Sequence, residues 1–380
     1  MTFVENLDPV VEPVGHPPLL AGRSVAVVHE WFGATGGAES TFLVLADLVP
    51  HAHRFVLWAD RDVPVEQLRL RQSWMARTPL TRSKAVALPL MPLVWRGWDG
   101  DPLDVVISSS HAFAHTARFG PPERTRHLSY VHSPARYVWS PSLDSRGRNP
   151  LLSLPRRALQ AADVRLSRHV HAYAVNSREV QRRVERFWGR DAVVIHPPVD
   201  VDYFAAAPRE QRAQPRDYLL GVGRWVPYKN FDLMMAAAAE AGLPLIIAGS
   251  GPEEARLRRA AERSRAQVTL ERRPTRERLR ELYWGARALL FPAHEDFGIV
   301  PVEAQACGTP VIGLRGGGLL ETVRDGETGH LVDSLAPAAY AAAVRRVAEL
   351  PVERIMDNAE RFSRQRFAAR MTEWIARESG

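Results

Sequence analysis

The chain of 380 residues contains a single cysteine, Cys307. One cysteine excludes an intramolecular disulfide framework and any metal site built from several thiolates, and it is typical of a reducing cytoplasm. The sequence also has no run of the ~18 apolar residues that a membrane-spanning helix needs. Residues 1–22 carry acids and prolines where a signal peptide would carry a basic stretch and an apolar core, so we interpret them as a flexible leader.

A nucleic-acid-binding motif is absent as well, and aromatic residues are not interleaved with the basic ones. The formal net charge of +7 therefore favours a phosphorylated small molecule or an anionic membrane face over nucleic acid as the partner. The hydrophobic content of 46% and the charged content of 24% are those of a globular protein. The length exceeds that of one ordinary core and indicates two domains.

Short, unbroken apolar runs recur along the chain, and helical segments lie between several of them. Such runs are typical of strands buried on both faces of a parallel sheet, so the pattern predicts a doubly wound α/β fold. In the first half the runs begin at Arg23, His53, Leu103, Arg126, His171 and Asp191. In the second half they are "DYLLGVGR", "LPLIIAGSG", "QVTLERRP", "ARALLFPA", "TPVIGL" and "GHLVDS".

A segment rich in proline, alanine and polar residues, 197–215, separates the two halves and is interpreted as a linker. We predict two Rossmann-like domains, residues 23–206 and 207–360, whose sheets face each other across a cleft. The tail from Val352 to Gly380 has one long helical pattern. Its bulky apolar residues can form a stripe that packs on a core, and these are Phe362, Phe367, Met371 and Trp374.

Ligands of open parallel sheets bind at the carboxyl ends of the strands, and the polar motifs of this sequence follow strands. The loop "GATGGAES" contains Gly36 and Gly37 directly before a helix. Glycine lets the backbone approach a ligand there, and the start of the helix offers N–H groups to an anion. A tight strand-to-helix turn explains the same glycines, and the sequence leaves both interpretations open.

The loop "GVGRWVPYKN" places Arg224 and Lys229 after the first strand of the second domain. Arginine forks onto a phosphate and lysine adds a compact charge, so the pair could stabilise a diphosphate leaving group without a metal ion. Two ordinary surface cations are the alternative. The next loop, "AGSGPEEARL" with Gly251, lacks the third glycine of the dinucleotide fingerprint, which argues against an NAD-dependent enzyme.

Two histidines follow strands of the first domain. His132, in "YVHSPARYVW", precedes a Ser-Pro turn and can point its imidazole at the cleft, where it could orient a substrate hydroxyl or pass a proton. His111, in "SSSHAFAHT", has a similar position. A hydrogen-bonded structural histidine remains the alternative for both.

The stretch "HEDFGIVPVEAQACGTPVI" holds Glu295 in a strand-to-helix loop and Glu303 about one turn into the helix that follows. Pro301 fits the first helical turn, and Gly308 ends the helix. The N–H groups of residues 297–299 would converge on an anion at the helix terminus, while the carboxylates suit hydroxyl groups. The stretch therefore predicts a ligand that carries both phosphates and hydroxyls, although a glutamate that merely favours the helix start is the alternative for Glu303.

Taken in order, these motifs resemble those of glycosyltransferase family 4, a large group of retaining enzymes with the GT-B fold that is related to sucrose synthase. The resemblance runs from about Val25 to Val332. It implies that the second domain binds a nucleotide-sugar donor and the first an acceptor, with no metal ion or other cofactor. It also implies that the C-terminal helix, about 361–380, crosses back to the first domain.

The same resemblance assigns roles to individual residues. The catalytic set has His132 near the donor sugar, Arg224 and Lys229 on the leaving diphosphate, and Glu295 on the sugar hydroxyls. Glu303 takes the ribose hydroxyls, and the other donor-binding residues are Gly36, Gly37, Gly223, Gly251, Phe297, Gly298 and Ile299. His111 and Glu39 are assigned to the acceptor side.

The stretches "HEDFGIVPVEAQACGTPVI" and "VPYKNFDL" are most similar to those of bacterial mannosyltransferases of O-antigen or exopolysaccharide synthesis. This similarity implies GDP-mannose as the donor and a saccharide or lipid-linked saccharide as the acceptor. Arg272 and Arg273 depart from the pattern, because relatives often carry a glycine near the nucleobase at this place. A GT-B enzyme that uses a UDP-sugar on a small molecule is one alternative, and a non-catalytic nucleotide-sugar-binding module is another.

Two further GT-B activities are disfavoured. A phosphorylase should carry a lysine motif for pyridoxal phosphate, which the sequence lacks. An epimerase of this fold is not expected to keep both Glu295 and Glu303 at this spacing.

The segment "RSKAVALPLMPLVWRGW" from Arg82 is apolar, broken by two prolines and flanked by arginines. With residues 155–169 it could form a basic, apolar face that binds an anionic membrane, or it could cap the core of the first domain. The first interpretation places a cytoplasmic protein on the inner face of the plasma membrane.

Overall fold

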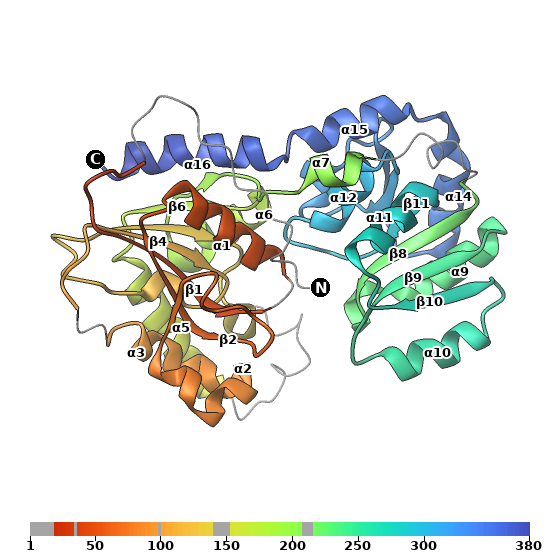
Figure 1. The fold of residues 1–380 in the computed structure, drawn as a ribbon. Coiled ribbons are helices and arrows are strands. Elements are labelled where there is room, and N and C mark those ends of the chain that lie inside the picture. The colour runs from red at the N-terminus through yellow and green to blue at the C-terminus, as the bar shows by residue number, and fades with distance from the viewer. Residues whose placement is uncertain (1–18, 34–35, 98–99, 140–152, 207–215) are drawn as a thin grey trace. The chain divides into compact units, whose positions relative to one another are not determined.

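The computed structural model describes residues 19–33, 36–97, 100–139, 153–206 and 216–380. The chain divides into two compact units, an N-terminal unit of Met1–Pro198 with Arg364–Gly380 and a C-terminal unit of Val199–Ser363. Each unit contains one parallel sheet with helices packed on it (Figure 1). Most of the predicted leader and residues 207–215 of the predicted linker lie outside the described residues.

The sheet of the N-terminal unit has the strand order β3-β2-β1-β4-β5-β6-β7. The strands are β1 (Val25–Phe32), β2 (His53–Ala59), β3 (Leu70–Gln72), β4 (Val105–Ser110), β5 (Arg126–Val131), β6 (Ala172–Val175) and β7 (Val193–Val194). All but the edge strand β3 correspond to predicted apolar runs. Every residue of β1 is buried, because this interior strand is covered on both faces.

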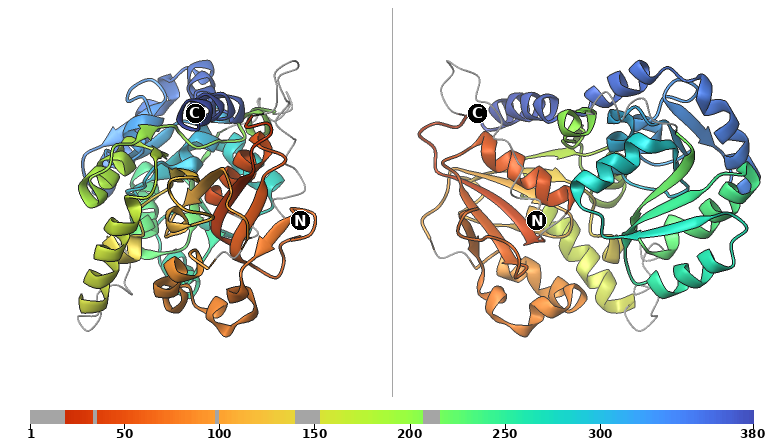
Figure 2. Two further views of the ribbon diagram at one scale, coloured as in Figure 1. Left: turned by 90° about the vertical axis from the view of Figure 1, so that its left-hand side faces the viewer. Right: turned by 45° about the vertical axis from the view of Figure 1, so that its right-hand side comes forward.

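Helices cover both faces of this sheet. They are α1 (Gly37–Leu48), α2 (Lys84–Ala87), α3 (Met91–Val94), α4 (Arg136–Trp139), α5 (Ser153–Ser167), α6 (Arg178–Trp188) and α16 (Arg364–Glu378), with 3₁₀ turns at Trp74–Arg77, Pro79–Arg82, Leu88–Leu90 and Ala114–Thr116. On one face α1 and α16 lie side by side, so that Phe42 and Leu45 share a core with Phe367 and Trp374 (Figure 2).

The sheet of the C-terminal unit has the order β10-β9-β8-β11-β12-β13. The strands are β8 (Tyr218–Arg224), β9 (Leu245–Ser250), β10 (Val268–Arg272), β11 (Ala286–Phe291), β12 (Val311–Leu314) and β13 (Gly329–Val332). The helices are α7 (Val201–Ala205), α9 (Phe231–Ala241), α10 (Glu254–Glu262), α11 (Arg276–Gly285), α12 (Ile299–Ala306), α13 (Leu319–Thr322), α14 (Pro337–Arg346) and α15 (Val352–Glu360), with 3₁₀ turns at Pro227–Lys229 and Val347–Glu349. All six strands coincide with predicted runs.

The prediction of one long C-terminal helix is wrong, because the tail forms two helices, α15 and α16. The helical path is interrupted between α15 and α16, where Ser363 forms a β-bridge with Val199. Phe362 packs on Phe297 in the core of the C-terminal unit, with ring centroids 5.4 Å apart. Phe367 and the rest of the stripe instead enter the core of the N-terminal unit, to which α16 returns.

The first unit also ends earlier than the predicted boundary at residue 206. Val199–Ala206, which contains α7, belongs to the C-terminal unit, where α7 packs on α12. None of the described helices is long and apolar enough to cross a membrane.

Candidate active site

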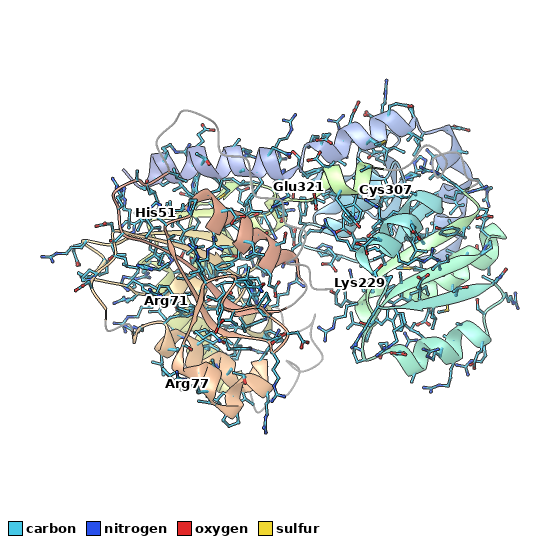
Figure 3. The ribbon with its side chains drawn as sticks, in the orientation of Figure 1. His51, Arg71, Arg77, Lys229, Cys307 and Glu321 are labelled. Carbon is cyan, nitrogen blue, oxygen red and sulfur yellow. The ribbon has the colours of Figure 1, made fainter. Side chains whose placement is uncertain are left out.

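Lys229 and Glu295 form an ion pair at the carboxyl ends of β8 and β11. Lys229 Nζ lies 2.7 Å from Glu295 Oε1, and the side chains are only 9% and 17% exposed. The ammonium group also lies 4.6 Å from the centre of the Phe291 ring (Lys229 is labelled in Figure 3). Asn230 anchors the lysine loop to β11, because its Nδ2 donates to the carbonyl of Pro292 at 2.6 Å. The pair is therefore held in place before any ligand binds.

Glycines make room around this pair. Gly223 has φ of +148°, and a Cβ there would lie 3.3 Å from Lys229 Cε, so a larger residue would press on the lysine. A Cβ at Gly251 would lie 2.4 Å from the carbonyl oxygen of Trp225, which accounts for that glycine by backbone packing. Arg224 ends β8 with an exposed side chain and forms no ion pair with any residue that the structure describes.

The loop after β11 enters α12 as the sequence predicts. Gly298 is the N-cap with φ of +93°, Ile299 is the first helical residue, and Gly308 follows the helix with φ of +70°. The first N–H groups of a helix have no carbonyl partner one turn earlier, so this terminus suits an anion. Phe297 is 3% exposed and belongs to the core, so its side chain fixes the loop while its backbone borders the helix start.

Residues 316–318, three successive glycines, pack against the same loop and were not recognised as part of the site from the sequence. A Cβ at Gly317 would lie 2.3 Å from the carbonyl oxygen of Glu295, and one at Gly318 would lie 2.2 Å from the backbone of Phe297. The N–H of Gly318 donates to the same carbonyl of Glu295 at 2.9 Å. Three glycines in a row were the available signal, because only glycine permits such close backbone contact.

Glu303 lies in α12, and its Oε2 accepts a hydrogen bond from the hydroxyl of Tyr283 at 2.9 Å. Burial raises the pKa of Glu303 to about 7, although the bond from Tyr283 acts in the opposite direction. The carboxyl group is thus partly protonated at neutral pH. Hydroxyl groups that donate to the charged form would lower this pKa again.

His132 and His111 come together at the carboxyl end of the sheet in the N-terminal unit, with ring centroids 6.5 Å apart. His132 Nε2 lies 2.9 Å from Ser109 Oγ, and its backbone carbonyl accepts from Asn176 Nδ2 at 2.9 Å. Burial, with the charges of His29 and His111, lowers the pKa of His132 well below its usual value. His132 is therefore a neutral imidazole with a fixed orientation.

His29 and Glu30, both in β1, complete this group and were missed from the sequence. Both are fully buried, and burial is also the main reason why the pKa of His29 falls to about 4. His29 Nδ1 lies 2.7 Å from the carbonyl of Ser109, and His111 Nδ1 lies 3.1 Å from Glu30 Oε2. A charged residue inside an otherwise apolar strand was the signal that could have found them.

Among the described residues, one group of three side chains could hold a metal ion. It consists of His29, Glu30 and His111, whose ligand atoms lie within 4.8 Å of one another. Two imidazoles and one carboxylate suit zinc and other first-row metals. The prediction that the enzyme needs no metal remains a prediction.

Glu39 and Gly36 lie together at the start of α1, which begins at Gly37. Glu39 Oε1 accepts the N–H of Gly33 at 3.2 Å, and a Cβ at Gly36 would lie 2.0 Å from Glu39 Oε2. Burial raises the pKa of Glu39, although the charge of His111 acts in the opposite direction. Any side chain at position 36 would therefore collide with the carboxylate of Glu39, which explains the glycine.

The segment from Arg82 contains α2, a 3₁₀ turn and α3, and its packing supports the interpretation as a cap, whereas the membrane face stays a prediction. Leu88, Met91 and Trp95 are buried in the core of the N-terminal unit, so the segment is a cap. Val86 and Leu93 are 59% and 62% exposed, so it also presents apolar side chains to solvent. Arg71 and Arg77, labelled in Figure 3, lie on the preceding β3 and 3₁₀ turn of the same unit.

Two family profiles match most of the chain. Residues 35–203 match Glycosyltransferase Family 4, and residues 205–366 match Glycosyl transferases group 1. D-inositol 3-phosphate glycosyltransferase from Acidothermus cellulolyticus is 39% identical over 178 residues, 40% of this chain and 40% of that protein. The protein of the same name from Streptomyces bingchenggensis is 34% identical over 205 residues, 46% and 45% of the two chains. The chain thus spans less than half the length of these curated relatives.

Solved structures show the same fold. HepE of Anabaena in complex with UDP superposes with a TM-score of 0.69 at 18% identity, over 93% of this chain and 100% of that chain. Sucrose-phosphate synthase from Thermosynechococcus elongatus gives 0.71 at 19% identity, over 93% and 98%. The predicted GT-B fold is confirmed by these similarities.

Proposed function

The chain belongs to glycosyltransferase family 4, and from this premise we propose that it transfers a hexose from a nucleotide sugar to an acceptor hydroxyl with retention of configuration. The observation that carries the proposal is the ion pair of Lys229 and Glu295, 2.7 Å long and nearly buried at the ends of two adjacent strands. A cation and a carboxylate held side by side match the two kinds of group that a nucleotide sugar presents at its reacting bond, phosphate and hydroxyl.

The phosphate side of the proposed site consists of Lys229, Arg224 and the start of α12. The ammonium group of Lys229 can donate three hydrogen bonds. One faces Glu295, so the other two are available to a diphosphate. Arg224 is exposed in the same loop and free to fork onto the same group. Charge develops on the diphosphate as the glycosidic bond breaks, and fixed cations stabilise it more in the transition state than in the ground state.

The hydroxyl side consists of the two glutamates. Glu295 uses the oxygen that Lys229 leaves free to accept from a sugar hydroxyl, and Glu303 accepts from the ribose. Because burial holds the pKa of Glu303 near 7, two ribose hydroxyl donors would favour the charged form. Nucleotide binding below pH 7 is then accompanied by proton release.

A UDP-hexose is the donor that we favour. Structures of HepE in complex with UDP and with UDP-glucose support this choice. The sequence relatives are named for transfer to D-inositol 3-phosphate, which concerns the acceptor and not the donor. GDP-mannose is the second candidate, since "VPYKNFDL" and the glutamate motif are most similar to mannosyltransferases. Arg272 does not decide between them, because its Nε already donates to Glu254 at 3.0 Å.

The acceptor is a saccharide or another polyhydroxylated compound, and a lipid-linked acceptor fits the surface of the cap segment. Val86 and Leu93 are exposed there between Arg82 and Arg96. Exposed apolar side chains beside arginines favour the face of an anionic bilayer, to which the protein would bind peripherally.

A panel of UDP-glucose, UDP-N-acetylglucosamine, UDP-galactose and GDP-mannose tests the proposal. We expect one donor to raise the melting temperature and to be hydrolysed in the presence of EDTA. Lys229→Ala and Glu295→Ala should each lower turnover about 100-fold or more, whereas the exposed control Arg259→Ala should not. Failure of every donor to bind would contradict the proposal, and binding without turnover would identify a non-catalytic module.

A further inference from the structure

Glu30 is a buried carboxylate of β1 that the proposed donor site does not use. Its Oε1 accepts the N–H groups of Ala112 at 2.9 Å and Ala114 at 2.6 Å, and the hydroxyl of Ser110 at 3.0 Å. These donors offset the cost of burying a charge and attach the carboxylate to the loop that follows β4. The backbone N–H of His111 reaches Oε2 only at 3.3 Å, so this oxygen is less saturated than Oε1.

His29, the residue before Glu30, has a ring nitrogen without a partner. Its Nδ1 lies 2.7 Å from the carbonyl oxygen of Ser109, which can only accept, so Nδ1 carries a proton. Its Nε2 is buried and has no hydrogen-bond partner among the residues that the structure describes, and the side chain is 0% exposed. A buried polar atom without a partner costs free energy. A histidine that binds a metal ion typically donates its other N–H to a carbonyl in this way.

His111 offers a second such nitrogen. Its Nδ1 is buried and lacks a hydrogen-bond partner in the described part of the chain, although it lies 3.1 Å from Oε2 of Glu30. Two ligand atoms of one tetrahedral zinc ion lie about 3.4 Å apart, so this separation is close to the one that zinc requires. The His111 side chain is 20% exposed, which gives an ion and a water ligand a path from solvent.

The neighbouring rings define the limits of this group. His132 lies outside it, because its Nε2 is 2.9 Å from Ser109 Oγ and its ring centroid is 6.3 Å from that of His29. Trp31 packs edge-on against His111, with centroids 4.2 Å apart, and limits the rotation of that imidazole. The group therefore has three protein ligands, which leaves the fourth position of a tetrahedral ion to water.

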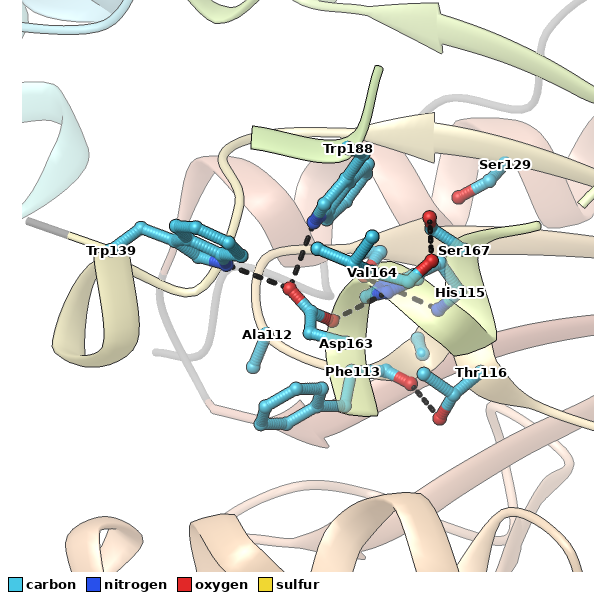
Figure 4. Close-up of polar contacts among 12 residues, drawn as sticks. Ala112, Phe113, His115, Thr116, Ser129, Trp139, Asp163, Val164, Ser167 and Trp188 are labelled. Atoms are coloured by element: carbon cyan, nitrogen blue, oxygen red, sulfur yellow. Dashed lines mark hydrogen bonds and ion pairs between the residues drawn. The ribbon is translucent and has the colours of Figure 1, made fainter. Parts of the chain in front are cut away.

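A network of hydrogen bonds supports Glu30 through Ser110. The hydroxyl of Ser110 also lies 3.2 Å from Nδ1 of His115, and Nε2 of His115 lies 2.9 Å from Oδ1 of Asp163 (Figure 4). Oδ2 of Asp163 accepts the indole N–H groups of Trp139 and Trp188 at 2.7 and 2.8 Å. Such paired networks restrict the orientation of each member, so Glu30 is held in place without an ion.

We propose that the N-terminal unit binds one zinc ion through His29, Glu30 and His111. Two imidazoles and one carboxylate form a common zinc ligand set, and imidazole nitrogens favour zinc over magnesium or calcium. The ion satisfies ring nitrogens that otherwise have no partner, and it joins β1 to the loop after β4. The inference does not rest on the proposed function, because Lys229 and Glu295 belong to the C-terminal unit.

Calorimetric titration of the full chain with zinc chloride, after treatment with EDTA and dialysis, tests the inference. We expect about one zinc ion per chain with a Kd on the order of 1 µM or lower. Zinc at about 100 times this Kd should raise the melting temperature by about 5 °C or more, because the ion binds only the folded state. Magnesium chloride should do neither, since magnesium prefers oxygen ligands.

Two variants locate the ion. Glu30→Gln keeps one oxygen for the N–H groups of Ala112 and Ala114 and replaces the other with an amide nitrogen, which does not bind zinc. His111→Ala removes the partly exposed ligand and decides the matter if Glu30→Gln does not fold. Each folded variant should bind zinc about 100-fold or more weakly, whereas the exposed control His53→Gln should bind it as the wild type does. Absence of saturable zinc binding by the wild type, or wild-type zinc affinity in either folded variant, would overturn the inference.

Discussion

Replacement of Glu303 by glutamine should make the unliganded protein more stable while it weakens nucleotide binding. Burial raises the pKa of Glu303 from 4.5 to about 7. A carboxyl group with a higher pKa in the folded state contributes stability that is fully present below the unfolded value and is lost as the pH rises through the folded value. The folded protein therefore loses stability between about pH 4.5 and pH 7.

The size of this loss follows from the pKa difference. One pKa unit corresponds to about 1.4 kcal/mol, so a pKa of about 7 in place of 4.5 costs up to about 3 kcal/mol above pH 7. Glutamine carries no charge and keeps an oxygen that can accept the hydroxyl of Tyr283, which now donates to Glu303 at 2.9 Å. Glu303→Gln should thus be more stable than the wild type by about 1–3 kcal/mol at pH 8 and equally stable at pH 4.

Urea unfolding at several pH values, followed by tryptophan fluorescence, measures this difference. The matched control is Glu262→Gln, an exposed glutamate of α10 in the same unit, which should change stability little at any pH. A Glu303→Gln protein that is less stable than the wild type at pH 8 would refute the reasoning. A stability difference independent of pH would refute it as well.

The same variant should lose nucleotide affinity, because a neutral amide replaces the charged acceptor that we propose for the ribose hydroxyls. A hydrogen bond to a charged group is worth about 1.5–3 kcal/mol, so the dissociation constant should rise about tenfold or more. Wild-type affinity should increase from pH 5.5 to 7.5, with proton release in calorimetry, and the variant should lack this dependence. Equal affinities at all pH values would remove Glu303 from the nucleotide site.

Three further changes test other parts of the structure. Asp163→Ala should cost about 3–5 kcal/mol in urea unfolding, because it leaves the buried groups of His115 and Trp188 and the half-buried indole of Trp139 without their partner. The exposed control Asp191→Ala should cost little, and a loss below about 1 kcal/mol for Asp163→Ala would contradict the network. Gly318→Ala should lower the free energy of unfolding by about 1–3 kcal/mol and weaken nucleotide binding, because its Cβ would lie 2.2 Å from the backbone of Phe297. The control Gly97→Ala should be neutral, since its Cβ would meet nothing closer than 3.6 Å, and equal effects of the two changes would contradict the packing. Leu93→Asp should reduce sedimentation with anionic liposomes at low salt, and absence of wild-type binding would reject the membrane face.

The parallel strands could be predicted because strands buried on both faces leave unbroken apolar runs. The edge strand β3 could not, because Leu70–Gln72 is short and largely exposed, so no apolar run marks it. The C-terminal tail was predicted as one helix because both α15 and α16 share the same periodicity. Their separation at Arg361–Ser363 depends on Phe362 and Phe367 entering different cores, which is a tertiary effect.

The positions of the residues that we propose to bind the donor could be predicted, because they follow strands and include glycines with visible spacing. Lys229 and Glu295 were identified separately, but their contact depends on β8 and β11 being neighbours in the sheet. Glu30 was missed, because residues inside an apolar strand are expected to be core. Its function as a buried acceptor for the loop after β4 depends on the pairing of β1 with β4.

Nucleotide-sugar turnover by the Lys229→Ala variant is the decisive measurement for the proposed donor site. We expect the wild-type protein to hydrolyse one donor of the panel in EDTA, and removal of the Lys229 ammonium group to lower kcat about 100-fold or more while the fold persists. A folded Lys229→Ala protein with near wild-type turnover would show that the donor site lies elsewhere.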